Sequence, residues 1–187
     1  NDLPFLGLCY GLQLAVVEYA RNMCGMEGAH TTEVNPQTKF PVIDVLPTQK
    51  QILAERQYGG SMRLGAYAAV LQDSLVRELY KKSGRIKKDM DAIRKLQKDS
   101  SQQFRIGKLN VGDNIILERH RHRFEVNPIF VEQLSKAGLL FSGAHNRLDN
   151  TKLMEFIELP KHKFFVGTQA HPEFKSRLGN PSPLFYG

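Results

Sequence analysis

The sequence has only two cysteines, and no apolar run reaches the ~20 residues that a membrane-spanning helix needs. No basic segment followed by an apolar one, which would indicate a signal peptide, opens the chain. Cys9 and Cys24 fall on or beside one predicted helix, ~22 Å apart, whereas a disulfide needs Cα atoms within ~7 Å. We therefore expect two free thiols, a cytoplasmic location and no membrane association.

The chain of 187 residues is long enough to bury a core without disulfides or metal ions. It begins with Asn1 rather than Met, a few residues before a predicted core strand. We expect one domain over residues 1–187 that is incomplete at its N-terminus.

Positive charge exceeds negative charge by 7, and much of the excess lies in one segment. Residues 81–98 read KKSGRIKKDMDAIRKLQK, with few apolar side chains and no aromatic ones. This composition predicts a solvated, mobile basic insertion at about residues 81–114. An anion-binding arm is the less favoured alternative, and no nucleic-acid partner is expected, because bases would find no stacking surface there.

The N-terminal segment has the pattern of a nucleophile elbow, a sharp turn between a strand and a helix. An apolar run ends at Gly7, G-x-C-x-G follows, and a helical pattern begins after Gly11. Both glycines are expected to avoid collisions in the tight turn. The helix amides should lower the pKa of Cys9 from ~8.5 towards ~7 and receive an oxyanion. The alternative is a small, buried core cysteine.

A second candidate motif follows the apolar strand predicted at residues 164–169. His171 and Glu173 flank Pro172, which discourages a helix. In an extended segment the two side chains point the same way, so the carboxylate would orient the imidazole. Because a cysteine nucleophile needs an oriented base, we predict a triad with Cys9. The alternative is a strand-end histidine and a helix N-terminal glutamate.

Helical and strand patterns alternate between these motifs. The strand at residues 153–159 alternates in polarity and is predicted to be an edge or one-sided strand. The whole pattern predicts an α/β fold, a three-layer sandwich with a mostly parallel central sheet. Three further helices are expected, at residues 11–24, from a cap at Asp73 to Tyr80, and from Asn127 to Gly138. Four further strands are expected, at residues 41–47, from a Gly59-Gly60 turn to residue 71, at residues 115–117 and at residues 139–142.

His120 and His122 alternate with arginines and would share one face of a strand. A metal site is not favoured there, because neighbouring cations would repel the metal and no thiolate or carboxylate pattern completes it. We predict a polar binding surface and no metal.

The two motifs together resemble the class I glutamine amidotransferases. Cys9 lies in G-x-C-x-G-x-Gln, and His-Pro-Glu follows far downstream. Thr32-Glu33 and residues 59–65 and 118–127 are similar to the glutaminase domains of the CTP synthase family. The similarity covers about residues 3–185 apart from the basic insertion.

The resemblance implies Cys9 as nucleophile, His171 as acid and base, and Glu173 as its partner. The backbone amide of Tyr10 would contribute to the oxyanion hole. A zwitterionic substrate such as glutamine needs an acidic group and a guanidinium, and Arg121 is expected behind the residues that supply them. The implied glutamine site comprises Tyr10, Gly11, Leu12, Gln13, Glu33 and Arg123.

The resemblance also implies glutamine as substrate and no cofactor in this domain. ATP and magnesium would act in a synthetase domain that aminates UTP, within a homo-oligomeric enzyme. The sequence departs from the family in three ways: Ala170 replaces an aromatic residue, residues 81–114 are longer, and the upstream glycine-rich oxyanion loop is missing. A stand-alone cysteine hydrolase of γ-glutamyl peptides and a non-catalytic basic binding module remain alternatives.

Overall fold

The structure is a computed structural model that describes residues 2–46 and 62–186, so the turn predicted at Gly59-Gly60 lies outside the described residues. Its main element is a six-stranded sheet. In the order in which they pair, the strands are β1 (Phe5–Leu8), β9 (Phe165–Thr168), β8 (Lys152–Glu158), β7 (Leu140–Asn146), β4 (Arg63–Leu71) and β5 (Asn114–His122).

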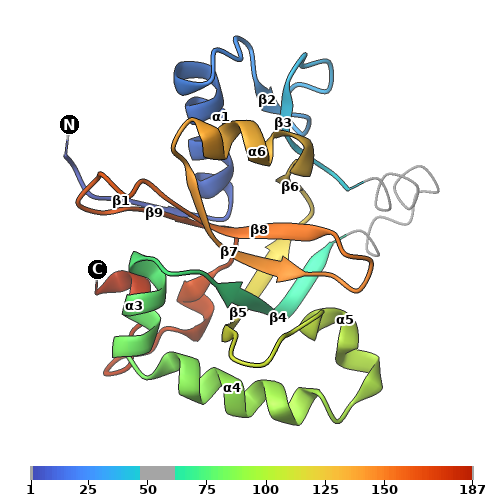
Figure 1. Ribbon diagram of the computed structural model, residues 1–187, viewed down its shortest axis with the longest axis vertical. Helices are drawn as coiled ribbons and strands as arrows, with labels where there is room; N and C mark the ends of the chain where they lie inside the picture. The colour runs from blue at the N-terminus through green and yellow to red at the C-terminus, as the bar shows by residue number, and fades with distance from the viewer. Residues whose placement is uncertain (1, 47–61, 187) are drawn as a thin grey trace.

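Helices cover both sides of this sheet, as the predicted three-layer arrangement requires (Figure 1). On one side lie α1 (Tyr10–Met23) and α6 (Pro128–Lys136), with a small sheet of β2 (His30–Thr31), β3 (Pro41–Asp44) and β6 (Glu125–Val126). On the other lie α3 (Leu75–Lys82), α4 (Arg85–Leu96) and α5 (Gln103–Ile106). Short 3₁₀ turns are η2 (Ser100–Gln102), η3 (Pro172–Lys175) and η4 (Pro183–Phe185). None of the helices within the described ranges is long and apolar enough to cross a membrane.

The pairing of the strands corrects the expectation of a mostly parallel sheet. In the six-stranded sheet only β1 and β9 pair in parallel, and every other described pairing is antiparallel. Residues 147–151 join β7 to β8, and residues 159–164 join β8 to β9. Connections this short permit only antiparallel neighbours, whereas β1 and β9 are joined by most of the chain.

Strand β8 is central and buried, which corrects its prediction as an edge or one-sided strand. It lies between β9 and β7, and its residues from Leu153 onward are buried. The polar positions of its alternating pattern are glutamates that find buried partners. Glu155 accepts a hydrogen bond from Arg63 at 2.7 Å, and Glu158 accepts one from the first backbone amide of α3 at 3.0 Å.

The helix caps agree with the sequence at one position and differ at another. Asn127 caps α6 by accepting a hydrogen bond from the Ile129 amide at 3.2 Å, at the predicted start of this helix. For α3 the cap is Ser74 rather than Asp73, because the Ser74 hydroxyl accepts from the Arg77 amide. Asp73 instead forms an exposed ion pair with Arg77.

The basic segment is folded, which corrects the prediction of a solvated, mobile insertion. Ile93 of α4 is buried against Ala68, Ile115 and Leu117 of the sheet. Asp89 is buried beside it and accepts a hydrogen bond from the Leu117 amide at 3.0 Å. The apolar residues of this segment are few, but helical spacing places them on one face while the lysines point outward.

We predict that Ile93→Ala lowers the free energy of unfolding by about 2–5 kcal/mol, because it opens a cavity in this core. Lys95→Ala, a change on the exposed face of α4, should alter it by no more than about 0.5 kcal/mol. Urea unfolding of both variants measures the difference. Equal effects of the two substitutions would contradict the packing described for α4.

Candidate active site

Cys9 occupies a strained position between β1 and α1. Its backbone has φ 50° and ψ −102°, and Asn150 is the only other described non-glycine residue with a positive φ. The Cys9 amide donates a hydrogen bond to the Thr168 carbonyl at 2.7 Å, which fixes the turn to the end of β9. A strained residue between a strand and a helix is the geometry of the predicted nucleophile elbow.

The two glycines beside Cys9 have different roles. A Cβ added at Gly7 would lie 2.8 Å from the Gly11 carbonyl carbon and 2.9 Å from the Phe5 ring. The expectation of a collision is therefore confirmed at Gly7. It is wrong at Gly11, where an added Cβ would meet no described atom within 4 Å.

The parallel pairing of β1 and β9 brings the two predicted motifs to the same edge of the sheet. Leu8 and Thr168 are register partners, so the chain segments after both strands begin side by side. The His171 amide donates to the Arg119 carbonyl at 2.7 Å, which anchors the histidine to β5 as well.

His171 and Glu173 form the predicted pair, with Nδ1 and Oε1 2.6 Å apart. They do so at the start of the 3₁₀ turn η3 and not in an extended segment, which corrects the geometry expected from Pro172. Pro172 is compatible with the first position of a helical turn, because no amide hydrogen is needed there. With Nδ1 engaged by Glu173, Nε2 is the ring nitrogen left for proton exchange.

The sulfur of Cys9 is surrounded by hydrogen-bond donors. The Gln169 side-chain amide lies 3.7 Å from Sγ, and the Tyr10 backbone amide also donates to the sulfur. Gln13 donates to the Gln169 side-chain oxygen at 3.3 Å and to the Phe124 carbonyl at 2.9 Å. Gln169 therefore joins the site, although its own sequence context gives no signal beyond its proximity to His171.

Burial raises the pKa of the Cys9 thiol, so the expectation of a lowered pKa is wrong. The charges of Glu125 and Glu173 raise the pKa further, while the hydrogen bonds from Tyr10 and Gln169 lower it. Loss of hydration outweighs the amide donors. The resting group is therefore a neutral thiol, and a base would be needed to form its thiolate.

A cavity of about 270 Å³ opens at Cys9. Four predicted substrate residues line it with the cysteine: Tyr10, Gln13, Glu33 and Arg123.

Several predicted residues do not line this cavity. Gly11, His171 and Glu173 are outside its lining, and the Leu12 side chain is fully buried in the core under α1. The Leu12 side chain therefore cannot contact a ligand in the cavity. The remaining lining residues, Met62, Arg121, His122 and Phe124, were not predicted to touch substrate, although three of them lie within two residues of Arg123 in the sequence.

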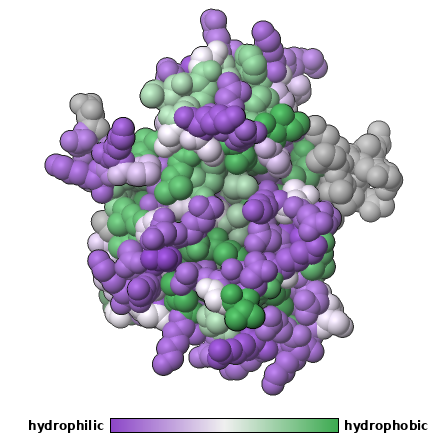
Figure 2. All heavy atoms as spheres, in the orientation of Figure 1, coloured by the Kyte–Doolittle hydropathy of each residue, from purple (hydrophilic) through white to green (hydrophobic). Residues whose placement is uncertain are grey.

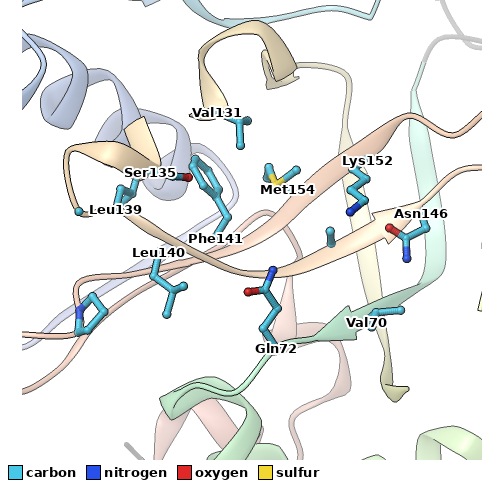
Figure 3. A pocket seen from close by; sticks show the side chains of 13 residues that line it. Val70, Gln72, Val131, Ser135, Leu139, Leu140, Phe141, Asn146, Lys152 and Met154 are labelled. Atoms are coloured by element: carbon cyan, nitrogen blue, oxygen red, sulfur yellow. The ribbon is translucent and has the colours of Figure 1, made fainter. Parts of the chain in front are cut away.

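A larger cavity of about 620 Å³ lies elsewhere, between α6 and strands β7 and β8 (Figure 3). Its lining includes Phe141, Met154 and Lys152 and none of the predicted site residues. Size alone therefore does not identify the site.

A buried cluster of charged side chains lies behind the Cys9 cavity. Arg63 donates to Glu155 at 2.7 Å and to Glu125 at 3.1 Å. His120 and His122 share a face of β5, as predicted, with ring nitrogens 3.0 Å apart, and His120 lies 3.3 Å from Glu155. Both histidines are buried in this cluster, and of the predicted polar binding surface only His122 reaches the cavity, beside Arg121 and Arg123.

Burial sets the ionisation of this cluster. It lowers the pKa of His120 and of His122 well below the usual value, and the Arg63 charge lowers both further. It raises the pKa of Glu125 to about 7, against the opposing charge of Arg63. Glu125 and Glu155 thus share the Arg63 guanidinium, and Glu125 is partly protonated near neutral pH. Within residues 2–46 and 62–186, no group of three or more histidine, cysteine, aspartate or glutamate side chains is arranged to hold a metal ion.

Comparison with protein families agrees with this geometry. The family model described as glutamine amidotransferase class-I matches residues 1–187. The chain therefore belongs to the class-I glutamine amidotransferase family.

Within that family the chain is similar to CTP synthases. It is 48% identical to the CTP synthase of Methanopyrus kandleri and 46% identical to that of Methanocaldococcus jannaschii, each over 188 aligned positions. These alignments cover all of this chain but only 28% of each relative.

A solved structure, the glutaminase domain of Trypanosoma brucei CTPS with bound acivicin, is also similar. It superimposes with a TM-score of 0.75 at 29% identity, over 99% of this chain and 58% of that one.

The different packing at the two glycines gives a test of the elbow. Gly7→Ala should lower the free energy of unfolding by about 1–3 kcal/mol, because its methyl group collides with the start of α1. Gly11→Ala should leave it unchanged or raise it by up to about 1 kcal/mol, since alanine favours a helix. Denaturant unfolding of both variants measures this, and a more destabilising change at Gly11 would contradict the geometry of the turn.

The raised pKa of Glu125 predicts a pH dependence of stability. The folded protein retains a proton that the unfolded chain loses near pH 4.5, so the stability is fully present below that pH and is lost as the pH rises through about 7. Between pH 6.5 and 8 this loss is about 0.8 kcal/mol at 1.36 kcal/mol per pKa unit.

Urea unfolding at these two pH values should therefore show a smaller decrease for Glu125→Gln than for the unchanged protein. An identical decrease in the two proteins would exclude Glu125 as the titrating group.

Proposed function

We propose that this chain is the glutaminase domain of a CTP synthase and that it releases ammonia from glutamine. The observation that carries the proposal is the parallel pairing of β1 and β9, which ends at Cys9 on one strand and leads to His171 on the other. Family membership and the similarity to CTP synthases support the same activity.

The cavity beside Cys9 suits a small zwitterion. Glu33 supplies a carboxylate for an ammonium group, and Arg123 supplies a guanidinium for a carboxylate. The glutamine side chain would then extend toward Cys9, with Tyr10 and Gln13 beside it. A volume of about 270 Å³ is small for a ligand site, which favours a free amino acid over a peptide.

In the first step, His171 removes the proton from the Cys9 thiol, and the sulfur attacks the carboxamide carbon of glutamine. The oxygen of the tetrahedral intermediate becomes negative and is stabilised by backbone amides, among them that of Tyr10. The carbon–nitrogen bond then breaks, and the nitrogen leaves as ammonia with the proton from His171. A glutamyl thioester on Cys9 remains.

In the second step, His171 removes a proton from water, and the resulting hydroxide attacks the thioester carbonyl. The carbon–sulfur bond breaks, glutamate leaves, and the sulfur recovers a proton. Glu173 holds the imidazole through Nδ1 and stabilises its cationic form during both steps. Protein groups alone supply this chemistry.

We further propose that the ammonia passes to a synthetase domain, where ATP and magnesium support the amination of UTP. The chain spans about 28% of the length of its curated relatives, so this second activity would belong to the remainder of the protein. Association into a homo-oligomer and a cytoplasmic location are parts of the same proposal.

We predict that Cys9→Ala abolishes glutamine hydrolysis in the natural full-length protein, while Cys24→Ala retains it. Cys24 is the matched control, because it is also a free thiol and lies at the opposite end of α1. Glutamate release measures the activity, and mass spectrometry after treatment with a glutamine-like electrophile should find one adduct, on Cys9. Unchanged glutamate release by Cys9→Ala would refute the proposal.

Parallel assays would separate the two alternatives. Faster hydrolysis of γ-glutamyl peptides than of free glutamine would favour a peptide hydrolase. No hydrolysis by the unchanged protein, together with salt-sensitive RNA binding, would favour a basic binding module.

A further inference from the structure

A third cavity, of about 480 Å³, lies where α3, α4 and the C-terminal segment meet. It has no lining residue in common with the cavity at Cys9. Its polar lining includes Lys82, Ser83, Arg85 and Asn180, and the lining also includes Tyr186 near the C-terminus. This cavity is therefore a separate site, built in part from the basic segment.

Arg85 is the notable member of this lining. The residue is only 7% exposed, yet its guanidinium makes no hydrogen bond or ion pair within the described part of the chain. The other deeply buried arginine, Arg63, binds two glutamates. None of its nitrogens is among the described buried atoms without a partner, so these donors face the cavity, where a ligand could accept from them.

The acidic residues nearest to Arg85 already have closer partners. The Arg85 charge lowers the pKa of Glu118 and the Asp89 charge raises it, so both acids lie near Arg85 or near each other. Lys175 approaches Asp89 at 3.1 Å and Glu118 at 3.6 Å, and Glu118 also accepts from the Tyr80 hydroxyl. These acids compensate for buried charge without using the donors of Arg85.

The start of α4 points to the same kind of ligand. Its N-cap is Gly84, the Ser83 hydroxyl accepts from the Arg85 amide at 3.4 Å, and no acidic residue lies in the first turn. The first helical residues are Arg85, Ile86, Lys87 and Lys88. Cations beside the positive end of a helix dipole are unfavourable, and a bound anion would relieve this.

We propose that this cavity binds a small organic phosphate. The phosphate would accept hydrogen bonds from Arg85 and form an ion pair with Lys82, near the N-terminal end of α4. The organic part would contact the apolar lining, which includes Leu79, Pro183 and Tyr186. A cavity of about 480 Å³ holds a molecule of that size.

The outer face of α4 carries further hydrophilic side chains, and the lower part of the surface in Figure 2, where α4 lies, is mostly hydrophilic with smaller hydrophobic patches. They could attract a polyanion without any cavity. A substitution on that face therefore serves as the control, and Lys95→Gln is suitable because Lys95 is exposed on α4 and absent from the cavity lining.

The test is calorimetric titration of the natural full-length protein with inorganic phosphate and with phenyl phosphate, at constant ionic strength in chloride. We expect saturable binding that is tighter for phenyl phosphate and absent for phenol. Arg85→Gln should weaken it about tenfold or more, since a charge-assisted bidentate contact is lost. Lys82→Gln should weaken it several-fold, and Lys95→Gln should leave it unchanged.

Three outcomes would overturn the proposal: no phosphate binding, binding of phenol as tight as that of phenyl phosphate, or equal losses in Lys82→Gln and Lys95→Gln. The last would indicate a diffuse attraction of polyanions. If Arg85→Gln does not fold, as judged by circular dichroism, the comparison of the two exposed lysines still decides. Glutamine hydrolysis should persist in Lys82→Gln, so the two proposals can fail separately.

Discussion

The parallel pair formed by β1 and β9 is the contact on which the active site depends. It joins the first described strand to the last, and its register sets Cys9 beside the segment that carries His171. The hydrogen bond from the Cys9 amide to Thr168 holds a strained backbone that an isolated turn would not keep. Gly7 permits this approach, because a side chain there would collide with α1.

The buried charges around Arg63 provide the second constraint. Arg63 comes from β4, Glu155 from β8 and Glu125 from β6, so one guanidinium ties the main sheet to the small one. Removing one member of such a cluster leaves another charge buried without a partner. The protein is then less stable than with the complete cluster. The cluster also borders the cavity at Cys9, because His122, at the end of β5, and Phe124, between β5 and β6, line that cavity.

The sequence predicted the local features of the site and missed those that depend on tertiary contacts. The elbow, the His171–Glu173 pair and the helix that starts at Asn127 were each predicted from a short motif with fixed spacing. By contrast, residues 153–159 were predicted to form an edge or one-sided strand, but this strand is central. Its glutamates can be buried because they accept hydrogen bonds from Arg63 and from the first amide of α3. The basic segment was predicted to be solvated because it has few apolar residues. In the folded structure, helix α4 directs one of them, Ile93, toward the sheet.

The pKa of Cys9 is the most instructive of these differences. A helix N-terminus favours a thiolate, but burial of the sulfur removes more hydration than the Tyr10 and Gln169 donors replace. A neutral thiol is a poor nucleophile and also resists oxidation, since both reactions need the thiolate. The group is therefore protected at rest, and the proposed mechanism assigns removal of its proton to His171. Glu173 and the Arg119 carbonyl of β5 both bind His171, so two independent contacts orient the base of the proposed mechanism.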